Sequence, residues 1–195
     1  MKKWIVPIVI IGLLFLWGFN LNNNAIELEE NINNSWSKVE SAYQRRNDLI
    51  GNLVKTVQGA ADFERGTLKD VIEARAKATS TKIDASNITP ENLEQFQKAQ
   101  NGLTGALSRL LLNVERYPDL KANKNFLELQ SQLEGTENRI NVARDRFNDT
   151  VEPYNKYVRK MPQKMILSMI GFSEKGYFKS DDGADSAPDV DFDFK

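Results

Sequence analysis

The stretch that decides the fold is residues 32–57, INNSWSKVESAYQRRNDLIGNLVKTV. Eight of its residues follow one another by alternating steps of four and three, which places them along one side of an α-helix. They are Ile32, Trp36, Val39, Tyr43, Arg46, Ile50, Leu53 and Val57. Only Arg46 among them is not apolar, and its long side chain has an apolar stem. The spacing predicts a long helix that packs one face in a bundle.

The same spacing returns in three later segments, about 60–81, 90–116 and 123–158. Turns are expected near 58–60, 82–90 and 117–121, with Thr89 as an N-cap and Pro90 at the first helical position. Gly51, Gly102 and Gly105 are expected where another helix approaches closely. The chain is therefore predicted to be all-α: a single N-terminal transmembrane helix, then an antiparallel up-and-down four-helix bundle with long helices.

Composition excludes several kinds of chemistry. The 195 residues include no Cys and no His, so disulfides, thiol catalysis, cysteine zinc sites and histidine acid–base chemistry are ruled out. The net charge of −1 gives no nucleic-acid footprint. We expect no cofactor, no small-molecule substrate and no enzymatic activity.

Residues 4–19, WIVPIVIIGLLFLWGF, carry no charge. Extended to Leu21, the run would span about 27 Å as a helix, enough for a bilayer core. The expected anchor residues are Trp4, Ile5, Ile10, Leu14, Phe15, Trp17 and Phe19. A cleaved signal peptide is the alternative, but the run is long and no small-x-small site follows it.

The flanking charges predict the orientation. Lys2 and Lys3 precede the apolar run and three glutamates follow it, which favours an N-terminus in the cytoplasm. The predicted location is the bacterial inner membrane, with the bundle on the outer or periplasmic side. Residues 20–34 contain seven asparagines and are either a softer stalk or part of a continuous helix.

The chain divides into an anchor (1–21), a bundle (22–160), an amphipathic segment (161–179) and an acidic tail (180–195) expected to be disordered. The amphipathic segment lies beside several basic residues. Its apolar residues are Met165, Ile166, Met169, Ile170, Phe172, Tyr177 and Phe178. They meet the membrane surface, cap the bundle or contact another protomer, and the three alternatives stay open.

Charged and polar residues on the otherwise apolar faces of the predicted helices predict a structural polar layer. Counting residues along antiparallel helices brings Arg75 level with a carboxylate, Glu137 first and Glu40 second, with Gln100 beside them. Arg46 and Glu64 are further members of this set. A buried arginine needs such a partner, because breaking a buried pair costs about 3–5 kcal/mol. A carboxylate metal site is the weaker reading, since such bundle sites use Glu-x-x-His pairs.

Several distinctive strings are spaced along the chain. They are WSKV (36–39), QRRNDLI (44–50), NLV (52–54), ARA (74–76), ERYPDLKA (115–122) and FLELQ (126–130). Together they resemble the LemA family over about residues 22–178. Further matches are Glu64, Leu133, Glu137, Arg139-Ile140, Ala143-Arg144, Phe147-Asn148, Tyr154-Asn155, Gly171-Phe172 and Tyr177-Phe178. Departures are Gly51, where the family often has Pro, residues 58–61, which replace a Lys-Gly-Tyr-Ala pattern, and Phe63, where His is common. The resemblance implies a single-pass, N-terminally anchored bacterial membrane protein with a helical bundle, and no established enzymatic activity.

Two functions fit these observations. The first is a membrane-anchored scaffold or assembly protein that acts through helical surfaces and self-association. The second is an accessory or adaptor subunit of a membrane protease, transporter or envelope enzyme. The expected partners are the lipid bilayer, a second copy of the chain and another membrane protein.

Overall fold

The structure, a computed structural model, describes residues 2–59 and 64–179, with side chains from residue 5 onward, and every regular element in these ranges is helical. The elements are α1 (Lys2–Gln58), α2 (Arg65–Ser80), the 3₁₀ turn η1 (Ala85–Asn87), α3 (Pro90–Val114), α4 (Pro118–Lys121), α5 (Lys124–Arg159) and α6 (Gln163–Met169). The predicted all-α class is confirmed for this part of the chain. The acidic tail, with the prediction of disorder made for it, lies outside the described residues.

The helix ends follow local chemistry. The Oγ1 of Thr89 accepts a hydrogen bond from the Asn92 amide at 3.2 Å, and Pro90 is the first residue of α3, as predicted. At the start of α5, the Oδ1 of Asn123 accepts from two backbone amides of the first turn. The predicted break after α1 is confirmed at Gln58. The turn predicted at 82–90 contains η1, and the turn predicted at 117–121 contains the short helix α4.

The first helix continues without a break from the apolar N-terminus into the core. α1 has 57 residues and passes through the asparagine-rich segment 20–34 as regular helix. Of the two alternatives for that segment, the structure therefore has the continuous helix. Burial begins at Leu21 and Ala25, so packing on the neighbouring helices compensates for the low helix propensity of asparagine.

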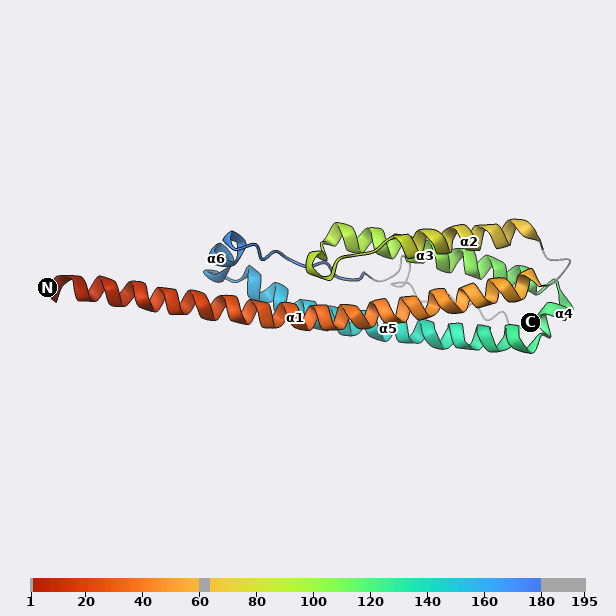
Figure 1. Cartoon of the computed structure of the whole chain (residues 1–195), viewed down its shortest axis with the longest axis horizontal. Coiled ribbons are helices and arrows are strands. Elements are labelled where there is room, and N and C mark those ends of the chain that lie inside the picture. The colour runs from red at the N-terminus through yellow and green to blue at the C-terminus, as the bar shows by residue number, and fades with distance from the viewer. Residues whose placement is uncertain (1, 60–63, 180–195) are drawn as a thin grey trace, which may run out of the picture.

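The long helices lie in two pairs (Figure 1). α1 packs along α5, and α2 packs along α3. Three contacts give the register of the first pair: the hydroxyl of Tyr157 donates to the Leu21 carbonyl, Ser35 bonds Thr150, and Arg46 meets Glu137. Residue numbers therefore fall along α5 as they rise along α1.

Two clusters of buried side chains form the core. The proximal core, nearer the N-terminal segment, is centred on Trp36, whose ring lies 5.4 Å from Phe96, 5.5 Å from Phe147 and 6.2 Å from Phe178. The distal core lies further along the helices. It includes Ile50, Leu53, Leu103, Leu110 and Phe126. Aromatic pairs at these distances add to the stabilisation that comes from burial alone.

The three glycines singled out in the sequence differ. A Cβ on Gly51 would lie 3.0 Å from the Arg75 guanidinium, which is a close contact between α1 and α2 as predicted. Nothing lies within 4 Å of the corresponding position at Gly102 or Gly105, so the prediction of close helix contacts there is wrong. Neither of these two residues is buried, because α3 packs through the positions beside them.

Candidate functional site

The N-terminal part of α1 presents apolar side chains to its surroundings. Among the described residues, α1 is the one helix long and apolar enough to cross a membrane. The expected anchor residues whose side chains are described are between 36% and 67% exposed. They are Ile5, Ile10, Leu14, Phe15, Trp17 and Phe19, whereas the side chain of Trp4 lies outside the described part. Apolar surface on this scale suggests a single-pass membrane anchor.

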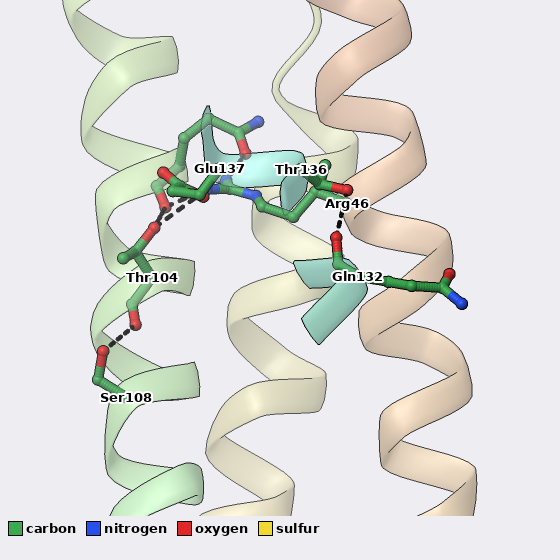
Figure 2. A network of polar contacts seen from close by, with 7 residues as sticks. Arg46, Thr104, Ser108, Gln132, Thr136 and Glu137 are labelled. Carbon is green, nitrogen blue, oxygen red and sulfur yellow. Dashed lines mark hydrogen bonds and ion pairs between the residues drawn. The ribbon is translucent and has the colours of Figure 1, made fainter. Parts of the chain in front are cut away.

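The most deeply buried arginine of the described chain is Arg46, whose side chain is 3% exposed. Its guanidinium donates to the Oε1 of Gln100 at 2.6 Å, to the Oγ1 of Thr104 at 3.1 Å and to the Oε2 of Glu137 at 3.3 Å. Figure 2 shows Arg46 together with Thr104 and Glu137, with dashed lines for the bonds between them. Gln100 in turn donates to the Ala78 carbonyl. This polar layer joins α1, α2, α3 and α5.

The position of the layer explains its effect on the fold. Arg46, Gln100 and Thr136, all buried, lie along their helices between the residues of the proximal core and those of the distal core. Glu137 is 44% exposed, so water screens its charge, and the amide of Gln100 is the principal buried partner. A buried cation with few acceptors tolerates little displacement of the helices. The layer therefore fixes their register.

The prediction that Arg75 meets Glu137 is wrong. The Nε of Arg75 donates to the backbone carbonyl of Asn47 at 2.9 Å, and Glu137 pairs with Arg46 instead. The cause is the connection between α1 and α2. The prediction assumed a tight turn at residue 59, but α2 begins only at residue 65, and the longer connection shifts Arg75 along α1.

The two other carboxylates expected in the layer lie apart from it. Glu40 is exposed in a groove that Arg75 also lines, and no bond joins these two side chains in the described structure. Glu64 lies at the start of α2 and is exposed. Neither carboxylate forms an ion pair with Arg46 or Arg75 among the described residues, where Glu137 is the carboxylate that pairs with Arg46.

The sequence contains a signal for the actual layer. On the predicted core face of α1, the one residue that is not apolar is Arg46. On that of α3 it is Gln100, among Leu93, Phe96, Leu103, Leu107, Leu110 and Val114. On that of α5 it is Thr136, among Phe126, Leu129, Leu133, Ile140, Ala143, Phe147, Val151 and Tyr154. In the structure, all three exceptions fall between the two cores.

A second polar arrangement holds the extended segment after α6, residues 173–179, which we call the strap. The side-chain amide of Asn155 donates to the Lys175 carbonyl and accepts from the Lys175 amide, each at 2.9 Å. Asn148 makes the same two bonds to Phe178, at 3.0 and 2.9 Å. Two helical side chains thus satisfy the backbone groups of a segment that has no neighbouring strand among the described residues.

Side chains also fix the strap. The ammonium of Lys175, 6% exposed, lies 2.6 Å from the Oε1 of Glu29 and donates to the Ser86 carbonyl at 2.9 Å. The hydroxyl of Tyr154 donates to the Ser173 carbonyl at 3.0 Å. Burial raises the pKa of Tyr154, so this residue remains a neutral donor.

The structure divides the apolar residues of 161–179 between two environments. Phe178 is buried in the proximal core, and Ile166 and Phe172 pack against it. The others are exposed: Met165, Met169, Ile170 and Tyr177. The segment therefore covers the proximal core with one face and leaves apolar side chains outside on the other. Met165, Met169 and Ile170, together with Met161 just before α6, are what we call the α6 surface, and Tyr177 belongs to the strap.

The remaining titratable groups with shifted pKa values stabilise local structure. Hydrogen bonds from the hydroxyl and the amide of Ser86 lower the pKa of Asp84, which caps η1. A bond to Glu152 raises the pKa of Lys156 on the exposed face of α5. Within the described residues, no group of three or more carboxylates is placed to hold a metal ion.

Comparison with known proteins identifies the family of the chain. The model of the LemA family matches residues 35–192. Magnetosome protein MamQ 2 of Paramagnetospirillum magneticum is 25% identical over 185 residues, covering 84% of this chain and 66% of its own length. Protein LemA of Metamycoplasma hominis is 26% identical over 152 residues, covering 77% of this chain and 65% of its own length. The chain thus spans just under two thirds of the length of these relatives. It belongs to the LemA family.

Proposed function

We propose that the chain is a non-enzymatic, membrane-anchored scaffold of the bacterial envelope that works through its helical surfaces and through self-association. In this proposal, α1, α2, α3 and α5 form one antiparallel up-and-down four-helix bundle that stands on the membrane. The buried polar groups described above fix helix register and hold the strap, which is the use expected of them in a structural protein.

The observation that carries the proposal is the continuity of α1. The same helix supplies the apolar N-terminal segment and, from Leu21 onward, part of the core. A bundle joined to its anchor by an unbroken helix keeps a defined distance and direction from the bilayer. Such an arrangement suits a protein that presents a surface to partners at the membrane.

The α6 surface supports the same proposal. Met161, Met165 and Met169 are spaced by four residues and are 68%, 61% and 87% exposed. Lys160 and Lys164 are exposed beside them. Figure 1 shows α6 beside α1 at the end of the bundle that faces the apolar segment. Flexible apolar side chains next to basic ones suit contact with the headgroup region of a bilayer. A second copy of the chain is the alternative partner that would cover the α6 surface.

Topology is tested by labelling. We expect the N-terminus in the cytoplasm and the bundle outside the inner membrane, so single cysteines in Ser41→Cys and Ser180→Cys variants should react with an impermeant maleimide in spheroplasts. The chain has no other cysteine, which makes the readout specific. If the cysteines at both positions react only after the spheroplasts are lysed, the orientation is the opposite one.

Self-association is tested on the full chain in mild detergent by size-exclusion chromatography with light scattering. A scaffold should form homo-oligomers without other components. A monomer that co-purifies with a membrane protease, transporter or envelope enzyme after cross-linking would instead support the adaptor function.

A further inference from the structure

A cationic groove runs between α1 and α5, apart from the residues that hold the strap. It has a volume of about 830 Å³ and is open to solvent. Its basic side chains are Lys38 and Arg45 from α1 and Arg139 and Arg146 from α5. The acidic residue in its lining is Asp48, and Ala42 and Ala143 lie among the charges.

The basic residues form two levels. The register of α1 and α5 given above places Lys38 level with Arg146 and Arg45 level with Arg139. Seven residues separate the two levels on each helix, which is about 10.5 Å at helical rise. None of the four forms an ion pair with an acidic residue of the described chain.

Lipid headgroups are too far away to occupy this groove. Lys38 lies well beyond Phe19, the end of the apolar run, at a distance of about 28 Å along the helix. The polar zone of one leaflet is only about 5–8 Å deep. An anionic partner must therefore come from the aqueous side.

The chain itself carries a segment of matching charge. Residues 180–195 contain six aspartates and one lysine, a formal charge of −5, whereas the first 179 residues carry +4. Near the C-terminus, the sequence DVDFDF (189–194) alternates acidic and apolar residues. In an extended conformation it would present Asp189, Asp191 and Asp193 on one face and the apolar residues on the other.

The attachment point of this tail is suitable. The carbonyl of Lys179, the last described residue, accepts from Arg144 of α5 at 2.7 Å. Arg144 lies between Arg139 and Arg146 along the same helix, so the tail begins at the level of the groove. Asp189 is ten residues further along, a reach of up to about 33 Å. The path around one side of a helix about 10–12 Å in diameter is roughly half as long as this reach.

We propose that the groove is the docking site of the chain's own acidic tail, with residues 189–194 lying between α1 and α5. The aspartates pair with the four basic side chains, and the apolar face covers Ala42, Val142 and Ala143. Tethering gives the tail an effective concentration of about millimolar, which compensates for the modest strength of each exposed ion pair. A free acidic peptide reaches the groove only after it displaces the tail.

The test measures a distance in the full-length chain in nanodiscs. Spin labels are attached to Ser37→Cys, which is exposed next to Lys38 on α1 but does not line the groove, and to Ala187→Cys, two residues before the docked segment. Pulsed electron paramagnetic resonance should give a short, narrow distance distribution at low salt. The distribution should lengthen and broaden at 1 M salt, where the Debye length is only about 3 Å.

Matched variants make the result specific. Arg139→Gln with Arg146→Gln should abolish the short distance, whereas Arg109→Gln with Arg116→Gln, which removes the same charge from exposed positions outside the groove, should leave it unchanged. A distribution that is broad from the start, or that responds equally to both pairs, would overturn the proposal. A short distance that disappears when labelled chain is diluted with unlabelled chain would place the tail on a second copy and would also overturn it.

Discussion

The hydrogen-bond partners of Arg46 differ in burial and in distance. This difference determines how much each partner contributes to the stability of the polar layer. Gln100 is buried and accepts at 2.6 Å, whereas Glu137 is half-exposed and lies at 3.3 Å. A hydrogen bond to a charged group contributes about 1.5–3 kcal/mol to stability. An ion pair that water screens contributes about 0–1 kcal/mol. The neutral amide should therefore matter more than the carboxylate.

We predict that Gln100→Leu lowers the free energy of unfolding by about 2–3 kcal/mol, because it removes a buried acceptor from a charged donor. Glu137→Gln should cost less than about 1 kcal/mol. Urea unfolding followed by circular dichroism measures both. Adding Arg46→Met to the Gln100→Leu variant should recover part of the loss, since the unpaired charge is then gone. Equal losses in the two single variants would mean that Glu137 is the principal partner.

Tyr154 gives the chain a specific response to alkaline pH. Its pKa is raised above the ordinary value of 10.0, so the folded state keeps a proton that the unfolded state loses. The stabilising contribution is complete below pH 10 and decreases as the pH rises above 10, by up to about 1.4 kcal/mol per pH unit.

We predict that Tyr154→Phe is about 1 kcal/mol less stable than the unmodified chain at pH 8, because it loses the bond to the Ser173 carbonyl. Above pH 10 the difference should shrink and then reverse. Urea unfolding of both proteins between pH 8 and pH 11 measures this difference in stability. The effect of lysine titration is common to both proteins and therefore cancels in the difference. A difference that stays constant over this range would show that Tyr154 ionises as an exposed tyrosine does.

Among the structural elements, the strap depends most on a few side chains. Asn155 makes two hydrogen bonds to the backbone of Lys175. We predict that Asn155→Ala releases this part of the strap, so that trypsin cleaves after Lys175 much faster, while the helical content is unchanged. Mass spectrometry of the fragments measures the rate. Asn141→Ala, at an exposed position of the same helix, is the control and should leave the rate unchanged.

The α6 surface yields a prediction about lipid contact. A bimane label at Met169→Cys should be quenched by lipids that carry a spin label near the headgroup, because this position is 87% exposed and faces the membrane in our proposal. Leu112→Cys is the matched control, being 70% exposed on α3 beside the distal core. Quenching at neither position, with cross-linking between copies at Met169, would assign the α6 surface to a protomer contact.

The sequence predicts those features of the elements that depend on neighbouring residues. The start of α3 at Pro90 and the end of α1 at Gln58 follow from caps and helix breakers, which act within one turn. The partner of Arg75 could not be predicted, because it depends on the length of the α1–α2 connection. The cationic groove was missed for a related reason: α1 and α5 are far apart in the chain, and no local signal shows that their outer faces adjoin.

At the scale of the whole molecule, the polar layer separates two cores that the same helices pass through. We predict that they differ in local stability. Leu110→Ala in the distal core should cost about 2–5 kcal/mol and should accelerate hydrogen exchange at Leu53 more than at Trp36. Ile140→Ala in the proximal core should instead accelerate hydrogen exchange at Trp36 more than at Leu53. Exchange that accelerates equally in both regions would show that the cores open as a single cooperative unit.

In the proposed membrane-anchored arrangement, the unbroken α1 is a rigid arm that pivots at the bilayer surface. From Leu21 to Gln58 the arm is about 56 Å long at helical rise. A change of only about 10° in the tilt of the apolar segment would swing its far end by roughly 10 Å, and tilts of bilayer-spanning helices vary over about 0–40°. Bilayer thickness, which influences this tilt, would thereby help to decide where above the membrane the far end of the protein lies.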